Sequence, residues 1–220
     1  MNSKISIFVA ELLGTFGLVV AATGSIVYDG SLGNSLGLGF ISMMHFAGLA
    51  FLVLVFGRYS MAHFNPAVTV GFAVSGHLKI GLIPLYLTAQ AIGAISGSIF
   101  VKYVIGNYSL LGMNLPNLKY SVPTIFLTEM LATIFLMGAI LIVISLKKNA
   151  LISGIVIGGV VALDVLFFAS ISGASMNPMR SLAPAILVGV YDDLWLYWTA
   201  PFLGSIIPAV IFVIMSRRKM

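Results

Sequence analysis

Six apolar segments decide what this chain can fold into. They are found at about residues 5–27, 36–56, 80–104, 123–146, 151–171 and 194–215. Each has roughly the 20 residues that a helix needs to cross a bilayer core about 30 Å thick. Hydrophobic residues make up 60% of the sequence and charged residues 8%, which excludes an ordinary soluble domain. The sequence therefore predicts an all-helical, multi-pass integral membrane protein.

The net charge of +5 is explained by membrane topology. If both termini share one side, that side holds Lys4, Arg58, Lys79, Lys147, Lys148, Arg217, Arg218 and Lys219. The other side holds three aspartates, Asp29, Asp192 and Asp193, with two lysines, Lys102 and Lys119, as exceptions. By the positive-inside rule we expect cytoplasmic termini, and we place the protein in the plasma membrane. A nucleic-acid partner is not expected.

Two Asn-Pro tripeptides, Asn65-Pro66-Ala67 and Asn177-Pro178-Met179, predict two further helix starts. Asn is a favoured N-cap, and Pro is favoured at the first helical position because it has no N–H to leave unpaired. The apolar stretch after each start ends near residue 75 or 188. It is roughly 16–18 Å long, about half of a bilayer core. Paired half-helices of this kind point to a midplane site built from inverted repeats.

The two halves of the chain repeat weakly. Residues 10–15, which contain Glu11, are similar to residues 128–133, which contain Glu129. Three spans in each half give the halves opposite orientations in the membrane. We expect a single domain over 1–220, with repeat one at about 1–108, a linker at about 109–121 and repeat two at about 122–220.

Three motifs carry a family resemblance: AELLGTF at 10–16, HFNPAVT at 63–69 and GASMNPMRS at 173–181. With them, the chain resembles the aquaporin (major intrinsic protein) family. The resemblance implies an aquaporin-like channel: six transmembrane helices plus two half-helices in an inverted 3+3 repeat around a narrow pore. It also implies a homotetramer with one pore in each subunit, embedded in membrane lipid.

The resemblance assigns the centre of the pore to Asn65 and Asn177. The side-chain oxygen of each Asn caps its helix, which leaves two amide N–H donors that we expect to be free for a passing water. Both half-helix N-termini carry a partial positive charge and face the same point, so they oppose protons and cations there.

Arg180 is the residue most difficult to explain structurally. It shares a helix face with Asn177, and a cation is unfavourable both in the first turn of a helix and at membrane depth. Val68 occupies the equivalent position of the first repeat, so the fold does not demand a charge there. By resemblance, Arg180 is the arginine of the selectivity filter.

Three more filter residues follow from the family's spacing: His45, Val165 and Ala174. A register shift of one would replace His45 by Phe46. Val165 and Ala174 favour a wide filter, whereas Ser181 after the arginine favours a water-type channel over a glycerol-type one. The two trends oppose each other, so the solute range stays open.

Irregular backbone at membrane depth survives only where it lines a cavity, so the stretches 61–64 and 173–176 must place their carbonyl groups there. By resemblance these oxygens form a ladder along one wall of the pore, opposite an apolar wall. The ladder consists of Met61, Ala62, His63, Phe64, Gly173, Ala174, Ser175 and Met176.

Three acidic residues and one methionine have more than one interpretation. If the protein is a transporter, Glu11 and Glu129 are proton relays. If it is a channel, they are buried anchors that bind the loops before the half-helices. Their equivalent positions in the two repeats favour the anchor role. Asp164 has no equivalent acid in the other repeat, and the sequence assigns it no role. Met179 replaces the small residue expected after Asn-Pro, and it either packs between helices or narrows the pore.

The predicted function is a passive channel for water and small neutral solutes, such as glycerol, ammonia or hydrogen peroxide, that excludes protons and ions. The alternative is an ion-coupled secondary transporter. The sequence has three histidines and no cysteine, and it shows no spacing typical of a nucleophile or metal site. We therefore expect neither enzymatic activity nor a metal or other cofactor.

Overall fold

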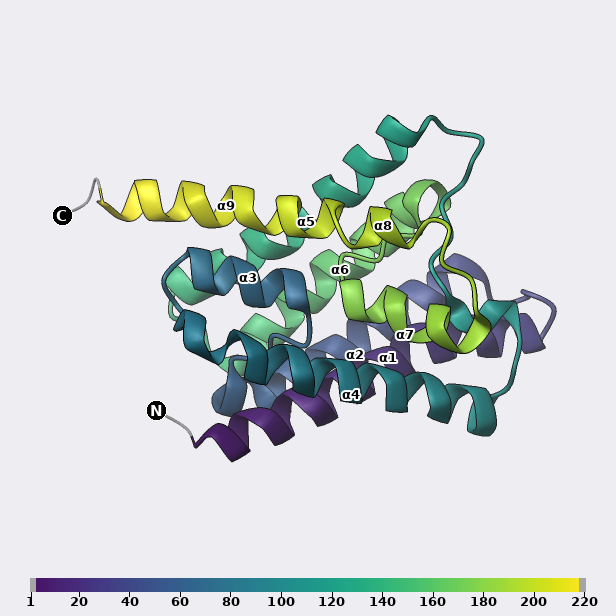
Figure 1. The fold of residues 1–220 in the computed structure, drawn as a ribbon, viewed down its shortest axis with the longest axis horizontal. Coiled ribbons are helices and arrows are strands. Elements are labelled where there is room, and N and C mark those ends of the chain that lie inside the picture. Colours follow the sequence, from purple (N-terminus) through teal and green to yellow (C-terminus); the bar gives the residue numbers. More distant parts are fainter. Residues whose placement is uncertain (1–2, 218–220) are drawn as a thin grey trace.

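In this computed structural model, residues 3–217 are described, and the regular secondary structure of that part of the chain is helical, without strands. The helices run in chain order as α1 (Lys4–Ser31), α2 (Gly37–Ser60), α3 (Pro66–Val74), η1 (Ile80–Leu82), α4 (Ile83–Phe100), η2 (Val101–Ile105), η3 (Ser109–Gly112), α5 (Val122–Ser145), α6 (Ala150–Ser172), α7 (Pro178–Val188), α8 (Leu194–Tyr197) and α9 (Ala200–Arg217). Figure 1 shows the long helices lying side by side, with both termini at one end.

Six membrane-spanning segments are present, as predicted: Lys4–Ser31, Gly37–Ser60, Ile80–Ile105, Val122–Ser145, Ala150–Ser172 and Leu194–Arg217. The first span is longer than expected because the buried Asp29 belongs to α1, where its Oδ1 accepts the Leu36 N–H at 2.8 Å. The third span ends in the π-helical turn η2, and the last is divided into α8 and α9.

The two predicted half-helices are confirmed as α3 and α7. With 9 and 11 residues they are about 14 and 16 Å long, about half of a bilayer core. Their N-caps, Asn65 and Asn177, have extended backbone with φ of −158° and −143°. Figure 1 shows α3 and α7 in line between the longer helices, and the two half-helices contact each other.

The inverted repeat is visible in the packing of the long helices. In the first repeat, α4 approaches α1 at Gly93, where a Cβ atom would lie 2.3 Å from the Leu12 carbonyl oxygen. In the second, α9 approaches α5 at Gly204, where a Cβ atom would lie 2.5 Å from the Met130 oxygen. Each half-helix also packs against a helix of the other repeat, α3 against α9 and α7 against α4.

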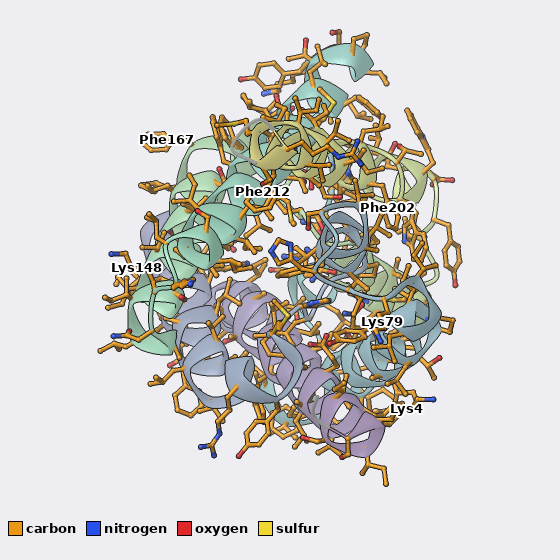
Figure 2. The ribbon with its side chains drawn as sticks, turned by 90° about the vertical axis from the view of Figure 1, so that its left-hand side faces the viewer. Lys4, Lys79, Lys148, Phe167, Phe202 and Phe212 are labelled. Carbon is orange, nitrogen blue, oxygen red and sulfur yellow. The ribbon has the colours of Figure 1, made fainter. Side chains whose placement is uncertain are left out.

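The basic residues gather at the end of the molecule that carries the termini. Figure 2 looks onto this end, where Lys4, Lys79 and Lys148 are labelled. Arg218 and Lys219, which the sequence assigns to the same side, lie outside the described residues. The two ends of the helix bundle therefore differ in charge, as the predicted topology requires.

Candidate functional site

The two loops that lead into the half-helices have the same unusual backbone. Before α3, the φ angles of Met61, Ala62 and Phe64 are 66°, 53° and 50°. Before α7, those of Gly173, Ala174 and Met176 are 86°, 43° and 54°. Side-chain-bearing residues rarely adopt this left-handed conformation, which costs of order 1–3 kcal/mol each and persists only where the surroundings impose it.

A buried glutamate fixes the conformation of the loop before α3. The Glu11 carboxylate is fully buried and accepts the backbone N–H groups of His63 and Phe64 at 2.9 and 2.8 Å. It also accepts the Ser60 hydroxyl at 2.6 Å and the Gln90 amide at 2.8 Å. Four donors fix this carboxylate, and the carboxylate in turn fixes the loop.

Glu129 holds the second loop in the same way. It accepts the Ser172 hydroxyl at 2.9 Å, the Ser175 N–H at 3.2 Å and the Met176 N–H. The contacts match those of Glu11 position by position, although Glu129 has no counterpart of the Gln90 bond within residues 3–217. This geometry favours the interpretation of both acids as anchors.

The two asparagines cap their own helices and also bind each other's loops. Asn65 Oδ1 accepts the Ala67 N–H at 2.9 Å, and its Nδ2 donates to the Met176 carbonyl at 2.7 Å. Asn177 Oδ1 accepts the Met179 N–H at 3.1 Å, and its Nδ2 donates to the Phe64 carbonyl at 2.8 Å. The expectation that both amide hydrogens are free is therefore wrong: one of each pair ties the two loops together, and only the other is left for a water.

Protein donors bind three oxygens of the predicted carbonyl ladder. The oxygens of Phe64 and Met176 accept these Asn amides, and the Gly173 oxygen accepts the Asn114 amide at 2.8 Å. The five other carbonyls have no hydrogen-bond partner within residues 3–217: Met61, Ala62, His63, Ala174 and Ser175. A carbonyl oxygen has two lone pairs, so the oxygens of Phe64, Met176 and Gly173 each keep one, and the ladder of eight carbonyls stays a prediction.

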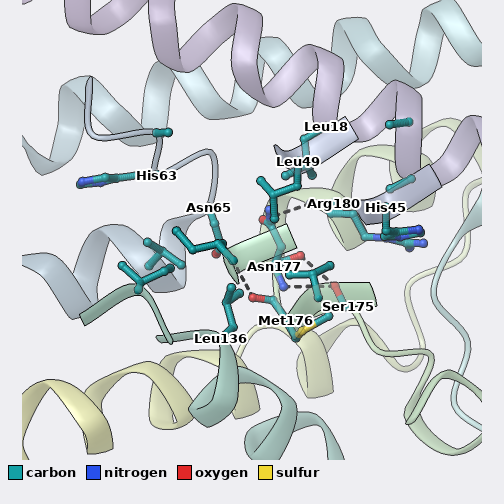
Figure 3. A pocket seen from close by; sticks show the side chains of 17 residues that line it. Leu18, His45, Leu49, His63, Asn65, Leu136, Ser175, Met176, Asn177 and Arg180 are labelled. Atoms are coloured by element: carbon teal, nitrogen blue, oxygen red, sulfur yellow. Dashed lines mark hydrogen bonds between the residues drawn. The ribbon is translucent and has the colours of Figure 1, made fainter. Parts of the chain in front are cut away.

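A narrow cavity of about 50 Å³ runs past the N-termini of the two half-helices, which line it together with α1, α2, α5 and α6 (Figure 3). A cavity needs about 10–15 Å³ to admit one water, so this one has room for a short file of waters. Its apolar wall consists of Leu18, Ala21, Ala22, Leu49, Leu136, Ile140, Ile157 and Val161. Figure 3 shows His63 at one end, Asn65 and Asn177 in the middle, and Arg180 beside His45 at the other end.

Arg180 and His45 stand between this cavity and a second one, since both residues line both spaces. The outer cavity has a volume of about 210 Å³. It is lined by Ile26, Leu38, Ile41, His45, Met113, Asn114, Leu115, Val165, Ala169, Gly173 and Arg180. Phe46 lines neither, so the unshifted register places His45 at the constriction.

The other two predicted filter residues differ from each other. Val165 lines the outer cavity, as its predicted position requires. The Ala174 side chain is buried in the apolar core, with 2% of its surface exposed, and lines neither cavity. Its left-handed backbone turns the methyl group into the core, so the neighbouring Gly173 and Ser175 line the two spaces instead.

The polar groups at the constriction have defined directions. His45 Nδ1 lies 2.8 Å from the Ile41 carbonyl, which can only accept, so Nδ1 carries a proton and Nε2 of the neutral ring is an acceptor. Arg180 Nη1 donates to the Gly112 carbonyl at 3.0 Å and to Asn114 Oδ1. Arg180 Nε is buried without a partner within residues 3–217. A donor and an acceptor therefore meet at this point.

Sequence reasoning missed three contributors. Gly112 and Asn114 lie in the linker, where no periodic pattern marks a residue that contacts a distant arginine. The side chain of His63 stacks between Phe72 and Tyr86, at 4.2 and 4.3 Å between ring centroids. Its Nε2 is buried without a partner in the described chain, although the residue lines the inner cavity.

The two ambiguous side chains, Met179 and Asp164, lie outside the pore. Met179 packs with Val19, Ala94 and Ala183, so it fills space between helices and does not narrow the cavity. Asp164 lines a groove formed by α5, α6 and α9, and its Oδ2 has no partner in the described residues. Nothing in the structure explains the Asp164 carboxylate.

Comparison with known protein families shows to which family this chain belongs. The family described as "Major intrinsic protein" matches residues 2–212. The chain belongs to the major intrinsic protein family. Relatives in this family include the "Probable aquaporin NIP7-1" of Arabidopsis thaliana, 37% identical over 98% of this chain and 78% of that protein. Nodulin-26 of Glycine max is 34% identical over 94% of this chain and 76% of that protein.

A solved structure has the same fold as this chain. The X-ray structure of the aquaglyceroporin from Plasmodium falciparum superimposes with a TM-score of 0.87. The match covers 96% of each chain at 24% sequence identity. At that identity the similarity shows the shared fold alone.

The anchoring geometry predicts a stability effect. Glu11→Gln replaces two acceptor oxygens by one, so at least one of the four donors loses its partner. Each unpaired buried group costs about 1–3 kcal/mol, and we expect a clearly lower midpoint of thermal unfolding in detergent. Glu129→Gln should give a similar loss, whereas Asp192→Asn, at an exposed acid, should give none. Native-like thermal stability of both glutamine variants would contradict the anchor interpretation.

Proposed function

We propose that this chain is a passive membrane channel for water and small neutral solutes. One observation carries the proposal: two cavities meet at Arg180 and His45, between half-helices whose capping asparagines bind each other's loops. Membership in the major intrinsic protein family supports it, and the channels of this family are not enzymes. A water enters from the outer cavity, passes Arg180 and crosses between Asn65 and Asn177.

Water moves easily along such a path because few groups hold it. The remaining amide N–H of Asn65 and Asn177 donates to a passing oxygen, and the unpaired loop carbonyls accept its hydrogens. The opposite wall offers only apolar side chains. Each water is therefore bound strongly enough to enter and weakly enough to leave.

Positive potential excludes protons and cations. The N-termini of α3 and α7 each contribute a partial positive charge near the asparagines. Arg180 adds a full charge at the constriction, and its Nη1 partners, the Gly112 carbonyl and the Asn114 amide, are neutral. These groups act together against cations while water passes.

The geometry at the constriction suits a small molecule that carries a hydroxyl or amide group. Such a solute accepts a hydrogen bond from Arg180, donates one to His45 Nε2 and lays its carbon side against Val165. We infer that the solute range includes a molecule of this kind, such as glycerol, besides water. Ammonia and hydrogen peroxide have no carbon side and would use only the two hydrogen bonds.

An ion-coupled transporter would need a free acidic side chain along the path, and none is present within residues 3–217. Glu11 and Glu129 are occupied by hydrogen bonds from the loops, and Asp164 lines a groove outside the cavity. Flux that neither saturates nor responds to a proton or sodium gradient distinguishes the channel from a carrier.

The charge barrier gives the first test of function. In proteoliposomes, Arg180→Ala should leave osmotic water flux largely unchanged and raise proton or cation leak several-fold, because the fixed charge at the constriction is gone. Stopped-flow light scattering and a pH-sensitive dye measure the two fluxes. Lys119→Ala, which removes an exposed lysine of the linker, is the matched control and should show no change. An unaltered leak in Arg180→Ala would remove this residue from the filter.

The width of the constriction gives the second test of function. Val165→His places a ring against the outer cavity, so flux of glycerol or urea should fall more than flux of water. Val165→Thr changes polarity but not bulk and should retain most of the solute flux. Strict water selectivity in the native protein, or unchanged solute flux in Val165→His, would contradict the assignment of Val165.

We further propose cytoplasmic termini, a plasma-membrane location and a homotetramer. The basic residues at the end that carries the termini support the orientation, and family resemblance supports the tetramer. Because the sequence has no cysteine, single substitutions report topology cleanly. In intact cells, a membrane-impermeant maleimide should label Lys119→Cys and not Ser3→Cys; the reverse pattern would invert the orientation. Native mass spectrometry in mild detergent should give four chains, and a monomer would refute the assembly.

A further inference from the structure

Asn114 joins three parts of the constriction although it belongs to neither half-helix. It lies in the linker after η3 and is 5% exposed. Its Oδ1 accepts Arg180 Nη1 and, at 2.8 Å, the Ser181 hydroxyl. Its Nδ2 donates to the Gly173 carbonyl at 2.8 Å. A single amide thus connects the linker, the first turn of α7 and the loop before α7.

The partners determine how this amide is oriented. A guanidinium group can only donate and a carbonyl can only accept, so the oxygen must face Arg180 and the nitrogen must face Gly173. Both lone pairs of Oδ1 are used. A carboxylate at this position would lack the donor for Gly173, and an aliphatic side chain would serve none of the three partners.

The same contacts divide the guanidinium group of Arg180 into two sides. Nη1 is held by Asn114 and by the Gly112 carbonyl at 3.0 Å, and both acceptors come from the linker. Nη2 has no hydrogen-bond partner within residues 3–217, and the residue lines both cavities. The linker therefore holds one side of the guanidinium and leaves the other for solutes, without neutralising its charge.

We propose that Asn114 is a positioning residue that sets the selectivity of the filter, a role that rests on the proposed channel function. It fixes the place of the Arg180 charge through a neutral acceptor. Loss of the amide frees Arg180 to move out of the path and widens the constriction. A carboxylate in its place pairs with Arg180 and lowers the barrier to cations.

The test compares three variants with the native protein in proteoliposomes: Asn114→Ala, Asn114→Asp and Asn117→Ala. Asn117 is the matched control, because it lies in the same linker and donates to the Ser170 carbonyl at 3.0 Å, but it does not bind Arg180. Water, glycerol and proton fluxes are measured on the same preparations, with thermal unfolding to verify the fold.

We expect Asn114→Ala to raise the glycerol-to-water flux ratio about two- to tenfold, the factor that corresponds to the net free energy of one hydrogen bond. Asn114→Asp should raise the proton-to-water ratio by a similar factor, because it adds an opposing charge. Asn117→Ala should keep both native ratios. A purely structural role would lower every flux together and leave the ratios unchanged.

The outcomes separate the two proposals. If the native protein conducts no water, the channel function itself is refuted. If the native protein conducts and both folded Asn114 variants keep its flux ratios, the role of Asn114 is refuted and the function stands. Should Asn114→Ala not fold, Ser181→Ala removes the hydroxyl that donates to Oδ1, together with its bond to the Ser175 hydroxyl. A smaller shift of the glycerol-to-water ratio supports the proposal, and an unchanged ratio overturns it.

Discussion

A backbone that leaves helical geometry inside a membrane must find partners for its N–H and C=O groups, and this requirement shapes the whole pore. The chain leaves it twice, at 61–64 and 173–176. Glu11 and Glu129 satisfy the exposed N–H groups, and the hydroxyls of Tyr86 and Tyr197 bind the last carbonyls of α2 and α6 at 2.8 and 2.6 Å. Because the N–H groups face protein acids, the loop carbonyls not bound by Asn side chains remain available to water.

Left-handed backbone, buried acid and capping asparagine thus form one unit that occurs twice. The unit explains why charged residues survive in the interior of an otherwise apolar protein: each carboxylate replaces the water that a loop would otherwise need. Arg180 has no counterpart in the first repeat, where Val68 stands. The pore is therefore symmetric in its scaffold and asymmetric in its charge, and the asymmetry places the constriction on the side of the asparagines where Gly112 and Asn114 lie.

Local sequence patterns predicted the scaffold well. Each of the six apolar segments and each of the two Asn-Pro starts is a signal contained in one continuous stretch of sequence. The structure contains the corresponding helices. Contacts between distant segments carry no such signal. The Asn114 bond to Arg180, the second role of the Asn amides and the inward turn of Ala174 depend on where remote parts of the chain meet, so the sequence did not reveal them.

The crossed amide bonds have a consequence for how the molecule is made. Asn65 donates to a carbonyl that lies 111 residues further along the chain, and the Phe64 carbonyl accepts from a residue 113 positions away. When the first three spans have left the ribosome, these groups have no partner yet. Neither repeat is a finished module, and the central polar groups are satisfied only when the last spans insert, so closure of the pore is a late and cooperative step of biogenesis.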